Sequence, residues 1–269
     1  MTSCFRSCKV IVWCAFVLGL FFAILILFYF WQDKHLAVRL VYAALLVALG
    51  VIAGRLIALR HASREHQKLF QLLYQSADPD RFIREYQPLP GRCKPDSAEY
   101  VMTTNYLSSG YAAKGDFAKA VSLLLSLEPE QLKFHQLGAS ALTQNNLCQY
   151  YLWMGDVEKA REQLQILEAL AEETKSRMPS VSKNLSSNLR LYQEHLHFLE
   201  EQPADAEYIR EEVGFSANLL HRANMQLLLA RVLLRQGDAA GAKELLEPLA
   251  EKYARLFAGA QAKKILSEL

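Results

Sequence analysis

The sequence predicts an all-α protein in which two membrane-spanning helices precede a domain of helical hairpins. Two long apolar runs lie before residue 60, and a Gly-Asp motif recurs at nearly regular intervals from Gly115 onward. After the Pro-Gly break at residues 88–91, leucine and alanine recur with a period near 3.6, and no segment alternates with the period of two that a strand requires.

The first apolar run, residues 10–31, contains 22 residues without a charge. A helix of that length covers the hydrocarbon core of a bilayer, which is about 30 Å thick. Trp13, Tyr29 and Trp31 lie near its ends, where amphipathic rings prefer the membrane interface. A cleaved signal peptide is the alternative, but its apolar region is usually about 7–15 residues and ends in small residues. We therefore expect a membrane anchor.

The second apolar run, residues 40–59, is interrupted by Arg55, whose guanidinium lies close enough to the helix end to reach the headgroups. An interfacial or core helix is the alternative. Few residues separate the two runs, and both carry small residues at four-residue spacing, which let helices approach closely in lipid. The small residues are Ala15, Gly19 and Ala23 in the first run, and Gly50, Gly54 and Ala58 in the second. We expect them to form the contact of an antiparallel hairpin, and the alternative is that they form the contact of a homodimer.

The charges of the chain divide into a basic head and an acidic body. Residues 1–69 carry eight Lys or Arg against two acids, a net of +6, whereas the remainder has 22 bases and 26 acids, a net of −4. The body therefore lacks the basic surface that binding to nucleic acid requires. The loop that connects the two spans carries two bases, Lys34 and Arg39. The segments before the first span and around the end of the second carry six: Arg6, Lys9, Arg55, Arg60, Arg64 and Lys68. The positive-inside rule then predicts an integral membrane protein with both termini and the repeat domain in the cytoplasm.

The five cysteines fit a reducing compartment. Their number is odd, and none forms a CxxC pair or a metal-ligand spacing with histidine. We expect reduced thiols at Cys4, Cys8, Cys14, Cys93 and Cys148.

A short connecting region leads from the membrane hairpin, residues 1–59, to the body. Residues 60–75 continue the second helix out of the membrane, and Asp78-Pro79 is typical of an N-cap followed by proline at the first helical position. The prolines and glycine of residues 88–91 end that short helix. We assign residues 60–95 to this connection and residues 96–269 to the repeat domain.

The Gly-Asp motif marks a helical turn three times. It occurs at Gly115-Asp116, Gly155-Asp156 and Gly237-Asp238, and the glycines are 40 and 82 residues apart. Glycine supplies the backbone conformation that ends one helix, and aspartate caps the next. A small residue follows four positions after each aspartate, where two helices pack closely: Ala120, Ala160 and Ala242. Hairpins at a near-constant period are typical of a helical solenoid.

Around these turns the chain resembles the tetratricopeptide repeat (TPR) family. The family has an apolar residue eight positions before the glycine, a tyrosine four before it and an alanine five after it. The first two turns match all three positions, with Leu107, Tyr111 and Ala120 and with Leu147, Tyr151 and Ala160. The third turn has Leu229, Leu233 and Ala242, with leucine in place of tyrosine. The resemblance covers roughly residues 96–256. It implies a right-handed TPR-like α-solenoid of about three to four helical hairpins.

The sequence departs from the family pattern in four ways. Thr104, Gln144 and Gln226 replace the family's early aromatic, and the closing proline is out of register. The period is near 40 rather than about 34 residues, which implies longer helices. One Gly-Asp turn is missing between Gly155 and Gly237, so we expect a degenerate hairpin from residues 178–202 and 203–213.

The sequence contains no constellation that predicts catalysis, a cofactor or a metal. No P-loop, dinucleotide fingerprint or nucleophile elbow occurs. His195 and His197 point to different faces of a helix and have no partner at zinc-ligand spacing, so we interpret them as surface or packing residues. We expect a protein that is not an enzyme.

Polar residues recur at similar depth in the first helices of successive hairpins. In proteins that the chain resembles, these positions line the concave groove that holds an extended peptide, and an asparagine amide offers that backbone both a donor and an acceptor. The alternative is that the asparagines join adjacent hairpins or lie in solvent. The predicted groove residues are Asn105, Asn145, Gln149, Trp153, Asn188, Asn224, Arg231 and Arg235, with Ser109, Asn184 and Tyr192 beside them.

These patterns favour a membrane-anchored, non-catalytic scaffold with a protein or peptide as its partner. The alternative is an accessory subunit of a membrane enzyme or transporter, which would carry ionisable residues inside its spans. Only Arg55 meets that requirement, near one end of a span.

Overall fold

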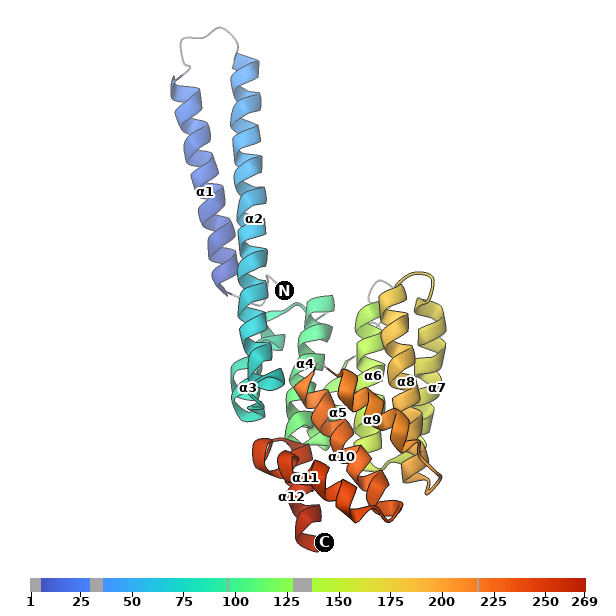
Figure 1. The fold of residues 1–269 in the computed structure, drawn as a ribbon. Helices are drawn as coiled ribbons and strands as arrows, with labels where there is room; N and C mark the ends of the chain where they lie inside the picture. Colours follow the sequence, from blue (N-terminus) through green and yellow to red (C-terminus); the bar gives the residue numbers. More distant parts are fainter. Residues whose placement is uncertain (1–5, 30–35, 96, 128–136, 217) are drawn as a thin grey trace. The chain divides into compact units, whose positions relative to one another are not determined.

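The computed structural model describes residues 6–29, 36–95, 97–127, 137–216 and 218–269 (Figure 1). These residues form twelve α-helices and one short 3-10 helix, with no strand among them, so the all-α prediction is confirmed. The chain divides into a unit of residues 1–68 with 91–93 and a second unit of residues 69–90 with 94–269. Each is described separately.

The first unit contains α1 (Arg6–Tyr29) and α2 (Leu36–Tyr74) as far as Lys68, and the last residues of α2, 69–74, belong to the second unit. Both are long and apolar enough to cross a membrane, and most of their large apolar side chains are exposed. At 39 residues, α2 is about 58 Å long, so it extends well beyond one hydrocarbon core, as predicted for residues 60–75. The expectation that Arg39 belongs to the connecting loop is wrong, because it lies in the first turns of α2. Trp31 and Lys34 lie outside the described residues.

The small residues of the two apolar helices face each other. A Cβ added to Gly54 would lie 2.5 Å from Ala15 Cβ, and one added to Gly19 would lie 3.3 Å from the Leu46 carbonyl oxygen. Positions later in α1 therefore meet positions earlier in α2, which is the antiparallel hairpin that the spacing predicts. The thiol of Cys8 donates to the Ala58 carbonyl at 3.3 Å, farther along the same contact.

The cysteine prediction is only partly correct. Cys8, Cys14 and Cys148 are free thiols, as expected. The expectation is wrong for Cys93, which is disulfide-bonded. Cys4 lies outside the described residues.

The connecting helix α3 (Pro79–Tyr86) begins as predicted. The Asp78 side chain accepts a hydrogen bond from the Arg81 amide at 3.1 Å, and Pro79 occupies the first turn. Phe82 and Tyr86 stack at 4.8 Å and are buried, so α3 packs on the following helix through an aromatic face. The 3-10 helix η1 (Pro90–Arg92) ends this segment.

The second unit contains nine further helices (Figure 1). Consecutive helices pack as pairs across each Gly-Asp turn. They are α4 (Ala98–Lys114), α5 (Phe117–Leu125), α6 (Leu137–Met154), α7 (Val157–Thr174), α8 (Pro179–Leu199), α9 (Ala206–Phe215), α10 (Leu219–Arg235), α11 (Ala239–Lys252) and α12 (Phe257–Glu268).

The three Gly-Asp turns have the conformation that the sequence predicts. Gly115, Gly155 and Gly237 have φ values of 94°, 74° and 86°, in the left-handed region that favours glycine. The aspartate that follows each glycine accepts a hydrogen bond from the backbone amide three residues later, at 2.8–3.2 Å. Ala120, Ala160 and Ala242 are completely buried, so the predicted close packing after each turn is confirmed.

The degenerate hairpin expected between residues 178 and 213 is not formed as predicted. Two helices occur there, but α8 packs on α6 and α7, whereas α9 packs on α10. The contacts between α8 and α9 are polar and few: Arg190 stacks on the Tyr208 ring at 3.8 Å, and Glu194 accepts from the Asp205 amide at 2.8 Å. The five residues between α8 and Asp205 contain no Gly-Asp turn and do not hold the two helices together.

The last helix returns to the first hairpin. α12 packs on α10 and α11 and also on α4. Phe257 lies against Gly115, Phe117 and Trp153, and Arg255 forms a 3.2 Å ion pair with Asp78. In a simple solenoid each repeat contacts only its neighbours. The return of α12 departs from that arrangement and places the start of the last helix against the first hairpin.

Candidate binding cavity

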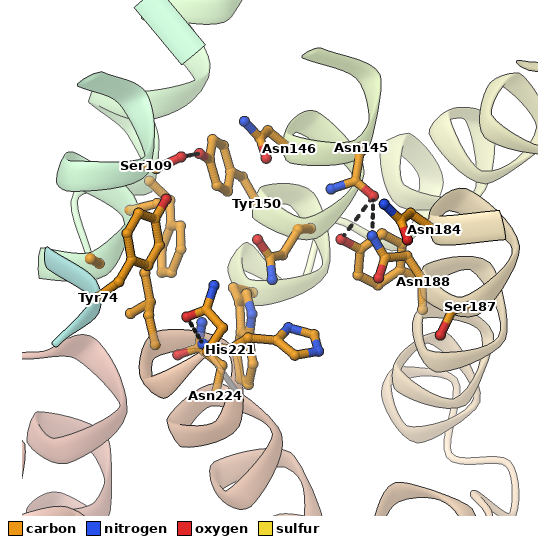
Figure 2. Close-up of a pocket in the computed structure, with 18 residues that line it drawn as sticks. Tyr74, Ser109, Asn145, Asn146, Tyr150, Asn184, Ser187, Asn188, His221 and Asn224 are labelled. Carbon is orange, nitrogen blue, oxygen red and sulfur yellow. Dashed lines mark hydrogen bonds between the residues drawn. The ribbon is translucent and has the colours of Figure 1, made fainter. Parts of the chain in front are cut away.

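A cavity of about 520 Å³ opens among α4, α6, α8 and α10, with the last turn of α2 beside it (Figure 2). Its wall contains six asparagines, together with Gln149, Ser109 and Ser187. Among the described residues that line it, none is Asp, Glu, Lys or Arg. The asparagines are Asn145, Asn146, Asn184, Asn188, Asn218 and Asn224. The cavity therefore offers amide and hydroxyl groups but no formal charge.

Asn145 joins two walls of the cavity. Its Oδ1 accepts hydrogen bonds from Asn188 Nδ2 at 2.8 Å and from the Tyr192 hydroxyl at 3.3 Å, as the dashed lines in Figure 2 show. Both donors belong to α8, whereas Asn145 belongs to α6. Because the oxygen has two donors, the orientation of this amide is fixed, and Nδ2 remains as a donor for another group.

Tyr150 joins α6 to α4 on the opposite wall. Its hydroxyl lies 3.1 Å from Ser108 Oγ and 3.4 Å from Ser109 Oγ. Burial raises the pKa of Tyr150 to about 12, so the phenol stays neutral. Phe117 packs on the same ring at 6.2 Å. This wall is therefore held in place by its own contacts.

Two amides on facing helices remain without a partner. Gln149 on α6 and Asn224 on α10 are half-buried, and neither side chain makes a hydrogen bond with any described residue. Both also border a small recess of about 20 Å³ beside Trp153. A bound molecule can reach these two amides, like that of the exposed Asn184, without breaking a contact of the fold.

The start of α10 closes one side. Asn218 is its N-cap, with Oδ1 accepting from the His221 amide at 3.2 Å. Burial lowers the pKa of His221, so the imidazole is neutral at pH 7. The N-terminus of α10 thus adds no side-chain charge.

The structure brings together five of the eight predicted groove residues. They are Asn145, Gln149, Trp153, Asn188 and Asn224, and the neighbouring residues Ser109, Asn184 and Tyr192 also line the cavity.

Asn105 lies elsewhere, and its position corrects the prediction. It is completely buried between α4 and α6, where Nδ2 donates to the Val101 carbonyl at 2.9 Å and to Thr143 Oγ1 at 2.8 Å. Its Oδ1 accepts from Asn146 Nδ2 at 3.1 Å. Asn105 therefore joins adjacent hairpins, which is the alternative role that the pattern allowed.

The two predicted arginines do not line the cavity. Arg231 donates to Gln261 Oε1 at 3.3 Å and lies 5.7 Å from the Trp153 ring. Arg235 donates to the Phe198 carbonyl and stacks on the Phe198 ring at 3.9 Å. Although they are one turn apart on α10, their contacts lie in different places, so they do not form the shared carboxylate site that their spacing predicted.

Trp153 is the point where four helices meet. Its ring contacts His195 of α8 at 4.5 Å and Phe257 of α12 at 5.4 Å, both edge to face, with Arg231 of α10 over it. Burial lowers the pKa of His195 to about 3, and the charge of Arg231 adds to that shift. His195 is therefore a neutral packing residue, as expected.

Six polar residues of the cavity do not belong to the predicted set: Tyr74, Asn146, Tyr150, Ser187, Asn218 and His221. Asn146 follows Asn145 directly, and a helix turns by 100° between them, so a pattern on one helix face includes only one. Asn218 could have been found as an N-cap, because it precedes the leucine-rich α10. Tyr74 reaches the cavity from the end of α2, which no repeat pattern covers.

The chain matches no protein-family model, no curated protein and no solved structure. Within the described residues, no group of three His, Cys, Asp or Glu is placed to hold a metal ion. What the cavity presents is a set of neutral hydrogen-bonding groups.

Proposed function

We propose that this protein is a membrane-anchored, non-catalytic binding platform whose cavity holds an extended peptide segment of a protein partner. The observation that carries the proposal is the cavity wall, in which neutral amides from α6, α8 and α10 surround about 520 Å³. A volume of this size is typical of a ligand site. Peptide units need one donor and one acceptor each, and a carboxamide supplies both.

Two further features support the same proposal. The helical pairs across Gly115, Gly155 and Gly237 carry the turn and the buried alanine of the TPR pattern, so we also propose a TPR-like architecture for this unit. The apolar helices α1 and α2 are suited to hold it at a bilayer. A tethered module of this kind recruits its partner by raising the partner's local concentration.

The experiment that tests the proposal compares two tryptophan variants. Ser187 is exposed and lines the cavity, whereas its exposed neighbour Ser186 does not. Ser187→Trp places a large ring at the cavity, and Ser186→Trp adds the same ring to the same helix elsewhere. Full-length protein is cross-linked in membranes, solubilised and purified, and its partners are identified by mass spectrometry.

We expect at least one partner to be lost in Ser187→Trp and retained in Ser186→Trp and in the wild type. The proposal is contradicted if the two variants retain every partner equally. If all partners depend on α1 and α2 instead, and they are subunits of an enzyme or transporter, the accessory-subunit alternative takes its place.

We further propose that both termini and the helical unit lie in the cytoplasm. The six-to-two distribution of bases supports this orientation, whereas the disulfide at Cys93 is more typical of an oxidising compartment. Reporter fusions after Leu269 and within residues 32–35 distinguish the two. A signal from outside the cytoplasm at Leu269 would reverse the orientation and agree with the disulfide.

A further inference from the structure

The cavity combines many hydrogen-bonding groups with no charge, and this combination limits what it can hold. Its eighteen lining residues include six asparagines, one glutamine, two serines and three tyrosines. An ionised group that enters such a site loses its water and gains no opposite charge, which is strongly unfavourable. A neutral group with donors and acceptors loses much less.

We infer that the cavity selects uncharged peptide segments, read through their backbone and through side-chain amides and hydroxyls, and excludes segments that place an acidic or basic side chain inside it. This inference rests on the proposed binding function and specifies the chemical class of its ligand. Gln149 and Asn224, the amides without a partner on facing helices, are the residues that we assign to reading the segment.

No lysine or arginine of α8 or α10 lines the cavity, including those that lie near the site in sequence, Lys183, Arg222, Arg231 and Arg235. Arg231 and Arg235 follow Asn224 on α10. The guanidinium of Arg231 contacts Gln261 and Trp153, and that of Arg235 contacts Phe198. His221 is neutral because burial disfavours its charged form. An acidic side chain in the cavity would therefore have no counter-charge, and a basic one would find no carboxylate.

A neutral sugar is the other ligand that matches an uncharged polar wall, but the aromatic rings argue against it. Sugars bind through C–H faces laid on open aromatic faces. Here Tyr150 and Tyr192 are only 2% and 4% exposed and contribute hydroxyls to contacts within the fold. The Trp153 ring is covered by His195, Phe257 and Arg231. The accessible hydrogen-bonding groups of the wall are mainly amides, which favours a peptide.

The amides of Gln149 and Asn224 can be charged without a change of size. Gln149→Glu and Asn224→Asp replace one amide nitrogen by oxygen and place an acid on the wall. Gln165→Glu makes the same replacement on the exposed surface of α7, outside the cavity, and serves as the matched control. Thermal unfolding of each full-length variant verifies that it is folded.

The probe is a random library of hexapeptides with acetylated and amidated ends, selected against full-length protein in nanodiscs. Selection against Ser187→Trp is subtracted, so that only cavity-dependent binders are counted. For wild type and Gln165→Glu we expect the central positions to be depleted of Asp, Glu, Lys and Arg. For Gln149→Glu and Asn224→Asp we expect Lys and Arg to be enriched there by about tenfold or more, the effect of one charge-assisted hydrogen bond.

Three outcomes would overturn the inference, and they are distinguishable. Wild-type binders rich in charged central residues would show that the cavity does not exclude charge. If the selected peptides are neutral and their central residues are the same for wild type, Gln149→Glu and Asn224→Asp, these two side chains do not contact the bound segment. A parallel array of neutral oligosaccharides that gives cavity-dependent binding while the peptides give none would replace the peptide by a glycan. If neither probe shows cavity-dependent binding, the proposed function itself fails.

Discussion

The ring of Phe257 stands edge-on to the ring of Phe117, with 4.8 Å between centroids and 84° between planes. Phe117 begins the second helix of the first hairpin, and Phe257 begins the last helix of the chain. The same phenylalanine also contacts Trp153 of α6. This contact joins the last helix to the first hairpin and holds α12 against Phe117 and Trp153, two residues that line the cavity.

Phe257→Ala is expected to release this contact. Loss of a packed phenylalanine costs roughly 3 kcal/mol or somewhat less, because Phe257 is only partly buried. Hydrogen exchange of the full-length protein should become faster in α12 and at the start of α5, and remain unchanged in α1. Phe215→Ala, at a ring that is 83% exposed, serves as the control. Equal exchange in both variants would mean that the aromatic contact does not hold α12.

The buried alanines after each turn provide a second test. Ala120→Leu, Ala160→Leu and Ala242→Leu each add three carbons where no space remains, so each should destabilise the helical unit by roughly 1–3 kcal/mol. Ala118→Leu, at an exposed position of the same helix as Ala120, should have little effect. Thermal unfolding followed by circular dichroism measures the difference. Three unchanged melting temperatures would contradict the packing.

The turn glycines should differ in their tolerance to alanine. All three have positive φ, which costs an L-residue roughly 1–2 kcal/mol. An added Cβ meets nothing within 4 Å at Gly155 or Gly237, but at Gly115 it lies 3.1 Å from the Phe257 ring. We expect Gly115→Ala to be the most destabilising of the three in denaturant unfolding. Gly214→Ala, in open space on α9, should be neutral or stabilising; a similar loss there would show that the φ argument is wrong.

Asn105→Ala tests the position of this residue between the hairpins. The substitution leaves Asn146 without its acceptor and Thr143 without its donor inside the protein, which should cost about 1–3 kcal/mol of unfolding free energy. Asn184→Ala removes an exposed amide on the cavity wall and should change stability by less than about 0.5 kcal/mol. Equal values for the two asparagines would contradict the assigned roles.

His195 makes the stability of the unit depend on pH. Burial lowers its pKa in the folded state to about 3, below the ordinary value near 6.5, so the unfolded chain binds the proton more readily. The contribution is complete above pH 6.5 and decreases as the pH falls toward 3, by at most about 1.4 kcal/mol per pH unit. His195→Gln should flatten the pH dependence of unfolding between pH 6.5 and 4. His197→Gln, at an exposed neighbour, should leave it steep.

Much of the local structure could be predicted from residues close together in the chain. The αL glycine and capping aspartate of each turn act within four residues, and Asp78-Pro79 starts α3 in the same way. The apolar runs and their small residues predict the α1–α2 hairpin, because in lipid close backbone approach depends on the absence of side chains. The recurring amides likewise identified Asn145, Gln149, Asn188 and Asn224 as one set.

The cavity itself depends on choices between distant helices. A period of 3.6 tells which face of a helix is buried, but not which helix covers that face. Asn105 and Asn145 therefore have the same position in the pattern, yet α6 covers the first completely, whereas α8 leaves the second on an open wall. The pairing of α9 with α10, the return of α12 to α4 and the directions of Arg231 and Arg235 were decided in the same way. The sequence by itself determined the helices, their turns and the recurring amides, because these depend on neighbouring residues. Only the tertiary structure decided which of those residues face a common space, because that depends on packing between helices far apart in the chain.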